Sequence, residues 1–411
     1  MAAILKIFLI MHCFFVLHGR HADGMPNVYD VTEYGAKPSN QDNTDAFLAA
    51  WRDACGSASG NATLLIPNGT FVVGAVKFSG PCNAGAGGGA TAVVIDGVLQ
   101  PHLSNDHDDG DWITFSRVNN LLITGSGTLD GHGSDGSTNH CQAKPLTTTL
   151  KLNVVTNTII RGLRSVNSRG FHVNIHRSSY VTAEGLHIEA PATSRNTDGI
   201  HVGASDHVTI SDTTIGTGDD CVSLGPGTTD IVVAGVTCGP GHGISIGSLG
   251  KTIGEENVRG VVVKNCTLSG TTNGLRIKTW PGSTSSSIWA YNITFKNITM
   301  NDVYNPIIID QHYCPHGQCS NITEPSLVQI SDVTYERIEG TSSSKKAVKL
   351  LCSESRPCSR LHLNEINLSC GDQTPCDTEI SNVQGMHDSV PQAPSPAPSP
   401  SHEQEANILL L

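Results

Sequence analysis

Residues 207–225, HVTISDTTIGTGDDCVSLG, and residues 230–247, DIVVAGVTCGPGHGISIG, follow one plan. Each begins with a short strand of alternating apolar residues, passes through a turn and a second strand, and enters a third strand after a glycine. Aligning these segments with their neighbours gives steps of 23, 27, 23 and 30 residues, at Ile160, Ala183, Ile210, Val233 and Val263. A further copy, 292–310, places Phe295 another 32 residues on. Repeats of this length are typical of solenoids.

We therefore predict an all-β fold, a right-handed parallel β-helix in which each repeat forms one coil. Such short strands cannot bury a face alone, but stacked coils bury a continuous core. No helical pattern separates the strands, which disfavours a doubly wound α/β sheet. A β-propeller needs repeats of about 40–50 residues, and a β-sandwich does not explain why the repeats align.

Both ends of the chain differ from the repeats. Residues 39–55, SNQDNTDAFLAAWRDAC, predict a short helix that caps the N-terminal end of the solenoid, with Asn43 or Thr44 as the N-cap. Residues 7–17 are largely apolar but too short to span a bilayer, and small residues precede Gly24. We expect a signal peptide at 1–24, a catalytic β-helix at 25–385 and a Pro-rich, disordered tail at 386–411. An uncleaved N-terminal anchor is the alternative.

The cysteines and sequons indicate a secreted, extracellular protein, and the net charge limits its partners. Removing the signal peptide leaves 12 of the 13 cysteines, an even number that favours disulfides over free thiols. Candidate pairs are Cys314/Cys319, Cys352/Cys358, Cys370/Cys376 and Cys221/Cys238. Glycosylation sequons lie at Asn61, Asn68, Asn265, Asn292, Asn297, Asn321 and Asn367. A net charge of −12 disfavours nucleic-acid binding, and we expect a monomer with no nucleic-acid partner and no membrane partner once the signal is removed.

A cluster of charged residues emerges from the alignment. Asp198, Asp220 and His242 occupy the same coil position at intervals of 22 residues. Stacked strands lie about 4.8 Å apart, so these side chains should form a ladder on one outer face, with Asp219 beside it. One coil further on, alternation along LRIK directs two basic side chains outward on the same strip, Arg276 and Lys278.

Close carboxylates cannot all ionise freely, so one of them should hold a proton at mildly acidic pH. A protonated carboxyl group beside an ionised one is the arrangement that glycoside hydrolysis requires. Arg276 and Lys278 would then bind an anionic sugar, which indicates a uronic acid. Each motif alone is weak, since GDD is usually a solvated turn. Cys221 could be a thiol nucleophile, but a disulfide suits a secreted chain better.

Four segments resemble the signature segments of the polygalacturonases, glycoside hydrolase family 28, which have the pectin-lyase-like β-helix fold. They are NTD at 196–198, GDDCVS at 218–223, GHG at 241–243 and RIK at 276–278. The similarity continues through 28–37 and 305–314 and covers roughly residues 27–380. It implies hydrolysis of α-1,4-galacturonosyl linkages with inversion. Asp219 would protonate the glycosidic oxygen, Asp198 and Asp220 would activate water, and His242 would support the acid.

The resemblance also implies substrate contacts. Arg276 and Lys278 would bind the galacturonate carboxylate, Tyr313 would stack on the sugar, Asn196 would contact it, and no cofactor or metal is expected. Residues 171–203, with His201, resemble pollen-type plant exopolygalacturonases. This favours exo action from the non-reducing end, for which a loop such as 132–148 must block the cleft. The alternatives are an endo-acting enzyme, a Ca²⁺-dependent pectate lyase and a non-catalytic polysaccharide-binding β-helix.

Overall fold

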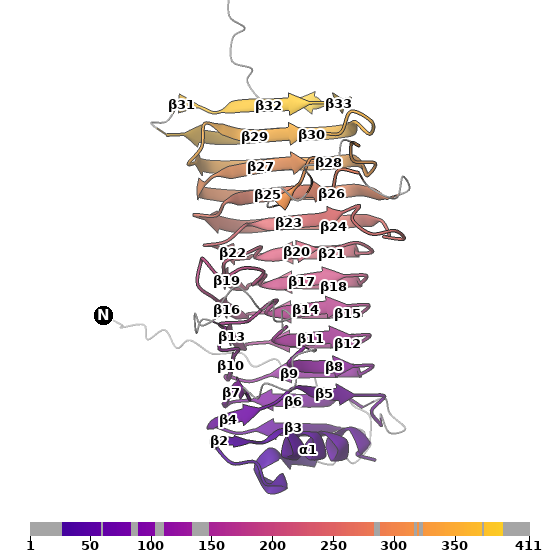
Figure 1. The fold of residues 1–411 in the computed structure, drawn as a ribbon, viewed down its shortest axis with the longest axis vertical. Coiled ribbons are helices and arrows are strands. Elements are labelled where there is room, and N and C mark those ends of the chain that lie inside the picture. The colour runs from indigo at the N-terminus through magenta and orange to yellow at the C-terminus, as the bar shows by residue number, and fades with distance from the viewer. Residues whose placement is uncertain are drawn as a thin grey trace, which may run out of the picture.

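The strands stack coil upon coil into a long column (Figure 1). The computed structural model describes residues 27–58, 61–83, 89–102, 111–133, 148–282, 288–315, 319, 324–371 and 374–388. Neighbouring coils pair in parallel, apart from a short antiparallel contact between β30 and β31 near the C-terminal end. The predicted right-handed parallel β-helix is therefore confirmed.

One sheet of 11 strands forms one side of the column. Its strands are β5 (Val76–Ser79), β8 (Ile113–Ser116), β11 (Leu150–Asn153), β14 (Val173–His176), β17 (Ile200–Gly203), β20 (Val222–Leu224), β23 (Ile244–Leu249), β25 (Asn273–Thr279), β27 (Asn305–Asp310), β29 (Lys346–Leu351) and β32 (Asp377–Ser381). We call it the site sheet, because the predicted catalytic and basic residues lie on its strands or on the turns that enter them.

The second sheet has 23 strands and begins as two separate rows. One row is β1 (Asn27–Asp30), β3 (Ala62–Ile66), β6 (Thr91–Ile95), β9 (Asn119–Thr124), β12 (Thr156–Arg161), β15 (Ser179–Glu184), β18 (Asp206–Ser211) and β21 (Thr229–Ala234). The other is β2 (Ser39–Asp42), β4 (Thr70–Val73), β7 (Val98–Pro101), β10 (Thr128–Asp130), β13 (Arg164–Val166), β16 (His187–Glu189), β19 (Thr214–Gly216) and β22 (Thr237–Cys238).

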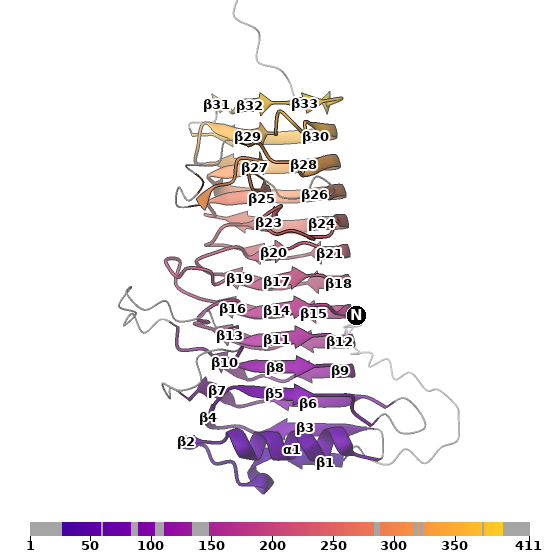
Figure 2. The same cartoon turned by 45° about the vertical axis from the view of Figure 1, so that its right-hand side comes forward.

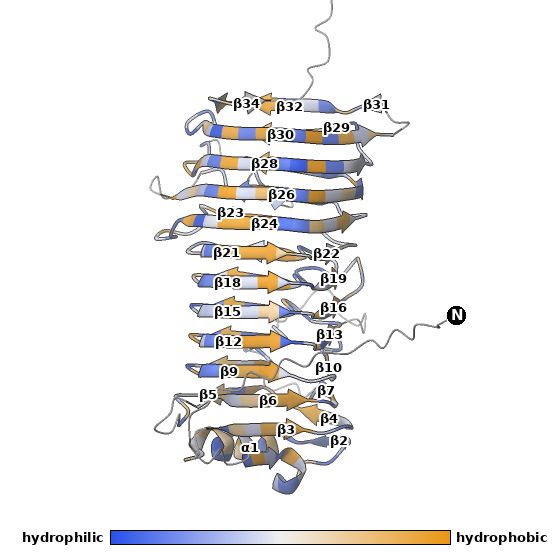
Figure 3. Ribbon diagram, turned by 180° about the vertical axis from the view of Figure 1, so that it is seen from behind, coloured by the Kyte–Doolittle hydropathy of each residue, from blue (hydrophilic) through white to orange (hydrophobic). Residues whose placement is uncertain are grey.

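The two rows merge in the C-terminal half, because β24 pairs with both β21 and β22. The merged strands are β24 (Val258–Ser269), β26 (Trp289–Val303), β28 (Gln329–Ser342) and β30 (Cys358–Cys370), followed by the short β31 (Thr374–Pro375), β33 (Val383–Gln384) and β34 (His387–Asp388). Hydrophobic and hydrophilic residues alternate along these long strands (Figure 3). The alternation directs one set of side chains into the core and the other to solvent.

The predicted repeat register is confirmed. Five successive pairings join the aligned positions, from Ile160 to Ala183, Ile210, Val233, Val263 and Phe295. All six side chains are at most 1% exposed and lie in the core. The same turn also recurs, because one residue at the start of this strand is left-handed in coil after coil: Asn120, Asn157, Tyr180, His207, Asp230, Gly260, Asn292, Asp332 and Arg360. Asn, Asp and Gly tolerate this conformation best, which explains their recurrence.

The capping helix is also present. Helix α1 (Thr44–Gly56) closes the N-terminal end of the column (Figure 2) and buries Phe47, Ala50 and Trp51. A short 3₁₀ helix, η1 (Val31–Tyr34), precedes it. Asn43 takes the predicted N-cap position, but its side chain makes no capping hydrogen bond and accepts one from the N–H of Lys37 instead. The Thr44 N–H donates to the carboxylate of Asp42.

All four candidate disulfides form. A fifth, Cys55–Cys82, ties α1 to the loop after β5 and was not predicted. The expectation that disulfides account for the mature cysteines is wrong at Cys266, a buried free thiol whose pKa burial raises to about 11. Cys141, the predicted signal peptide, sequon Asn321, most of loop 132–148 and most of the predicted tail lie outside the described residues.

Among the residues described, none of the helices has the length and apolar character needed to cross a membrane.

A buried histidine predicts how stability depends on pH. His172 is fully buried, its Nδ1 lies 2.8 Å from Ser165 Oγ, and burial lowers its pKa to about 3. The ordinary value is about 6.5, so the unfolded chain takes up the proton first as pH falls. The stability from neutral His172 is thus present above about pH 6.5 and is lost toward pH 3. We expect His172→Leu to reduce the slope of the unfolding free energy by about 1.4 kcal/mol per pH unit within this window, measured by denaturant titration. An unchanged slope would contradict this.

Candidate active site

The candidate catalytic residues lie on turns that enter the site sheet. Asp198 stands two residues before β17 begins at Ile200, and His242 stands two before β23 begins at Ile244. Ile200 pairs with Val222, and Val222 pairs with Ile244. Asp198, Asp220 and His242 therefore share one position on three successive coils, as the 22-residue spacing predicts.

A glycine brings two of these turns into contact. A Cβ on Gly218 would lie 1.9 Å from the backbone oxygen of Ser194, so only glycine fits there. The Gly218 N–H donates to Thr197 Oγ1 at 3.1 Å. The GDD turn is thus packed against the turn that carries Asp198, and the adjacent carboxylates are not a freely solvated loop.

Asp220 is the most enclosed carboxylate of the three. Its side chain is 1% exposed; one oxygen accepts from Arg276 at 2.7 Å, and the other accepts from Lys278 Nζ at 2.8 Å. Ser245 Oγ donates to the first oxygen at 2.7 Å, and Arg276 Nε donates to Ser245 Oγ. Burial alone would raise the pKa of Asp220, but the charges of Arg276 and Lys278 lower it to about 2. Asp220 is therefore a fixed negative charge.

Asp198 is buried without a cation of its own. Among the described residues its carboxyl group has one hydrogen-bond partner, Ser223, which donates to Oδ2 at 2.6 Å. Burial, together with the charges of Asp220 and Asp219, raises the pKa of Asp198 to about 8, although the Ser223 hydrogen bond opposes the rise. One carboxyl group of the cluster thus holds a proton at mildly acidic pH, and in the free protein it is Asp198.

Asp219 is the most accessible of the three, with 21% of its side chain exposed. Its Oδ1 lies 3.1 Å from His242 Nδ1 and accepts from the N–H of Asp220, while Oδ2 accepts from the N–H of Asn196. Burial acts to raise the pKa of Asp219, but the hydrogen bond and charge of His242, together with the Asp220 N–H, outweigh burial and lower the pKa below its usual range. The predicted ladder is thus right in backbone register, but His242 pairs with Asp219 instead of Asp220.

The remaining predicted residues surround this cluster. Tyr313 lies beside both basic side chains, with its ring centre 5.2 Å from Lys278 Nζ and 5.9 Å from the Arg276 guanidinium carbon. Trp280 meets Tyr313 edge to face at 5.5 Å, and Lys251 Nζ lies 4.9 Å from the Trp280 ring. Asn196 is exposed in the left-handed conformation that Asn tolerates. Aromatic and basic groups therefore adjoin the carboxylates on the β25 side.

Sequence reasoning missed the two serines, Ser223 and Ser245. They face the same strip as Arg276, because Ser223 pairs in register with Ser245 and Ser245 with Arg276. Because side chains alternate along a strand, both serines point away from the core of the β-helix. This alternation is the sequence signal that could have identified them. His201, known only as part of a resemblance, pairs in register with Ser223.

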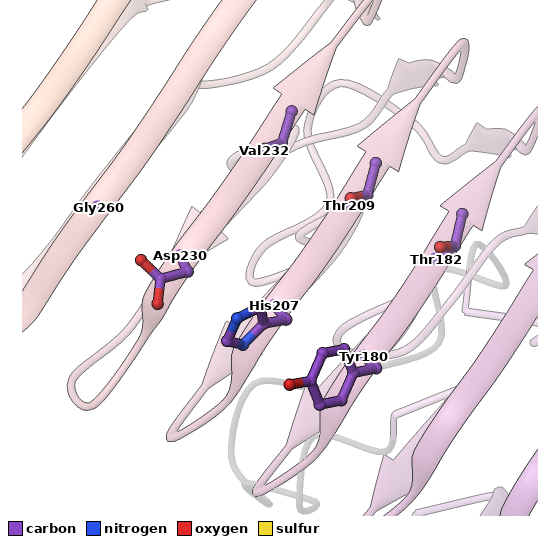
Figure 4. A pocket seen from close by; sticks show the side chains of 7 residues that line it. All are labelled: Tyr180, Thr182, His207, Thr209, Asp230, Val232 and Gly260. Carbon is purple, nitrogen blue, oxygen red and sulfur yellow. The ribbon is translucent and has the colours of Figure 1, made fainter.

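A hollow lies on the row β15–β18–β21, away from the site sheet (Figure 4). It is lined by Tyr180, Thr182, His207, Thr209, Asp230, Val232 and Gly260. Asp230 is the only carboxylate in this lining. The hollow therefore lacks the acid and base pair that the other cluster contains.

The fold and this cluster define a class of protein: a parallel β-helix that carries three carboxylates, a histidine and two basic residues on one side. The family model described as glycosyl hydrolases family 28 matches residues 55–390. The chain belongs to this family of glycoside hydrolases.

Similar proteins support the assignment. The chain is 43% identical over 366 residues to an exopolygalacturonase of Platanus acerifolia, covering 87% of this chain and 94% of that one. It is 41% identical over 381 residues to an exopolygalacturonase of Zea mays (89% and 91%) and 40% identical over 367 residues to a polygalacturonase of Gossypium barbadense (87% and 88%).

Two solved structures share the fold. An exopolygalacturonase from Thermotoga maritima superposes with a TM-score of 0.70 at 18% identity, covering 84% of this chain and 87% of that one. A polygalacturonase from Erwinia carotovora gives 0.65 at 24%, covering 90% and 99%. At these identities the likeness concerns the fold alone.

Proposed function

We propose that the protein is an exo-acting polygalacturonase, which hydrolyses α-1,4-galacturonosyl linkages of pectin and releases galacturonate from the non-reducing end. The observation that carries this proposal is the trio Asp198, Asp219 and Asp220 held beside Arg276 and Lys278. Paired carboxyl groups supply acid and base for glycoside hydrolysis, and the two basic residues suit a sugar carboxylate. Relatives named exopolygalacturonase support exo action. Secretion to the cell wall, glycosylation and a monomeric state stay predictions.

The site residues have distinct proposed roles. Asp219, the exposed carboxyl group, protonates the glycosidic oxygen, while Asp198 and Asp220 activate the attacking water: ionised Asp198 takes its proton, and the fixed charge of Asp220 orients it. His242, whose Nδ1 lies 3.1 Å from Asp219 Oδ1, holds the acid in place. A bound sugar excludes water and favours the protonated form of Asp219, because desolvation disfavours the charged carboxylate. Arg276, Lys278, Tyr313 and Asn196 contact the substrate.

Catalysis then requires a rearrangement of protons. The free protein favours a proton on Asp198 and a charge on Asp219, whereas turnover needs the reverse. The state with the proton on Asp198 and the state with the proton on Asp219 hold the same number of protons. The ratio of their populations is therefore independent of pH between the two macroscopic pKa values of the pair. The pH profile of kcat/KM is therefore bell-shaped, and its alkaline limb reports the loss of the shared proton near the pKa of about 8 at Asp198.

The donor set does not fit a Ca²⁺-dependent lyase. Atoms of Asp219, Asp220 and His242 lie within 4.8 Å of one another. Ca²⁺ takes about six to eight oxygen ligands, yet one of these three residues is a histidine. Both Asp220 oxygens already accept hydrogen bonds from Arg276, Ser245 and Lys278. Two cations at the same carboxylate oppose the binding of a third.

The proposal is tested by a product time course on de-esterified polygalacturonate at mildly acidic pH, with and without EDTA. We expect saturated galacturonate to appear one unit at a time, at the same rate with EDTA. Mixed oligomers with a rapid fall in viscosity would make the enzyme endo-acting. An unsaturated, ultraviolet-absorbing product that EDTA abolishes would identify a lyase. Binding without new reducing ends would leave a polysaccharide-binding β-helix.

A further inference from the structure

Asp198 is connected to two residues that have no part in the proposed catalytic roles. Ser223 Oγ donates to Asp198 Oδ2 at 2.6 Å, and His201 Nδ1 lies 2.8 Å from the same Oγ. When Asp198 is ionised, the hydroxyl gives its single proton to that carboxylate. It therefore accepts from His201, and this assigns a hydrogen to Nδ1 of the ring.

The His201 ring is held firmly in this orientation. It stacks on Phe171 with a centre-to-centre distance of 4.6 Å and an angle of 19° between the planes. His201 on β17 and Ser223 on β20 are also register partners, so the backbone fixes their separation. Burial lowers the pKa of His201 to about 4, so the ring is neutral at pH values well above 4.

We propose that His201 and Ser223 are positioning residues that stabilise the ionised form of Asp198 and so set the fraction of enzyme in the productive proton state. The inference rests on the proposed function, because it assigns Asp198 to the water. Hydrogen bonds to a carboxylate favour its charged form. Neither residue touches the reacting atoms; His201 acts through Ser223, and Ser223 acts through Asp198.

Other groups also face Asp198 and His201. They are Asp219 and Asp220 from the turn before β20, Lys278 from β25 and His176 from β14. The two aspartates raise the pKa of Asp198 and Lys278 lowers it. These groups remain in place when His201 or Ser223 is replaced. A difference in the pKa of Asp198 between a variant and the wild type therefore comes from the His201–Ser223 pair.

The proposal predicts a quantitative link between rate and pH profile. A hydrogen bond to a charged group contributes about 1.5–3 kcal/mol, so its loss should raise the pKa of Asp198 by about 1–2 units. The alkaline limb of kcat/KM should move up by that amount. The fraction of enzyme in the productive proton state falls tenfold for each unit by which the pKa of Asp198 rises above that of Asp219. The plateau of the kcat/KM profile should therefore fall by about 10–100-fold. A purely structural defect would lower the plateau without moving the limb.

The experiment compares kcat/KM for galacturonate release across pH for the full chain and its variants. Ser223→Ala removes the donor, and His201→Phe keeps the stacking on Phe171 but removes the nitrogen. Both should move the limb upward, and the double variant should resemble Ser223→Ala, because the two act in series. His201→Asn keeps an amide donor near the position of Nδ1 and should restore most of the wild-type profile.

The chain offers a matched control on another face. His207 lies beside Tyr180 (Figure 4) and stacks on it at the same distance of 4.6 Å. Its Nδ1 lies 2.7 Å from a carboxylate oxygen of Asp206. His207 lies on β18 and lines the hollow away from the site sheet. His207→Phe therefore repeats the same substitution at a similar stack and should leave both plateau and limb unchanged.

A second measurement does not depend on activity. With ¹³C-labelled aspartate, the carboxyl resonance of Asp198 should titrate at a higher pH in Ser223→Ala and His201→Phe than in the wild type. Unchanged limbs and an unchanged Asp198 titration would overturn the proposal while leaving the proposed function intact. A wild type that releases no galacturonate would overturn the proposed function, and the titration would still decide whether His201 and Ser223 stabilise ionised Asp198.

Discussion

Replacing Asp219 by asparagine is expected to lower the rate of galacturonate release by about a thousandfold or more, since general acid catalysis contributes about 10²–10⁴. Asparagine has a similar shape but no proton to give to the leaving oxygen. The fold should be retained, because the change removes one negative charge beside buried Asp220. The melting temperature is expected to be unchanged or higher.

Asp212→Asn is the control for this prediction. Asp212 lies on the same coil, is exposed and has a left-handed backbone that asparagine also adopts. It should retain wild-type activity. If Asp219→Asn kept more than a tenth of the wild-type rate, the proton would have to come from another group.

The second large effect is expected at Arg276. Arg276→Gln leaves buried Asp220 with one cation instead of two, and breaking a buried pair costs about 3–5 kcal/mol. We expect a loss near the lower figure, because Lys278 remains 2.8 Å away. The sugar carboxylate also loses one of its two proposed cationic partners, so kcat/KM should fall by a hundredfold or more. Denaturant unfolding and initial rates measure the two effects.

The pH dependence of that variant has a defined sign. Arg276 helps to depress the pKa of Asp220 to about 2, and the resulting stability is present above the ordinary value near 4 and lost as pH falls toward 2. Without Arg276 the pKa of Asp220 lies closer to its ordinary value, so this pH-dependent part of the stability should be smaller.

A surface ion pair provides the comparison. In the Arg360–Asp332 pair the side chains are 58% and 41% exposed, and Arg360→Gln should change the free energy of unfolding little. Equal costs at Arg276 and Arg360 would show that burial of the Asp220 pair contributes little.

Much of the architecture could be predicted, because residues one repeat apart in a solenoid sequence become neighbours on adjacent coils. The aligned positions from Ile160 to Phe295 are strand partners in the structure. The same periodicity placed Asp198, Asp220 and His242 on three successive coils. Close cysteine pairs were also predictable, since a separation of five or six residues leaves few alternatives.

Side-chain partnerships were harder to predict, because they depend on turn conformation. Periodicity suggested that His242 continues the column of Asp220, yet its ring turns to Asp219. Asn43 or Thr44 was predicted as the N-cap of α1; Asn43 holds that position, but its amide bonds to Lys37 and Val72 and caps no helical N–H. Cys55 and Cys82 are 27 residues apart and meet only because α1 folds back on the first coils. The proton on Asp198 depends on burial, which spacing alone does not report.

The two serines have a consequence for how a repetitive scaffold acquires function. A shift of one coil maps Asp198 and Ser223 onto Asp220 and Ser245, and the serine lies 25 residues after its aspartate in both pairs. The two acids therefore occupy equivalent backbone positions on successive coils. The symmetry is broken by the group behind each serine, a histidine in one copy and a guanidinium in the other. Two chemically opposite carboxyl groups thus arise from one repeated unit, without a change in backbone path.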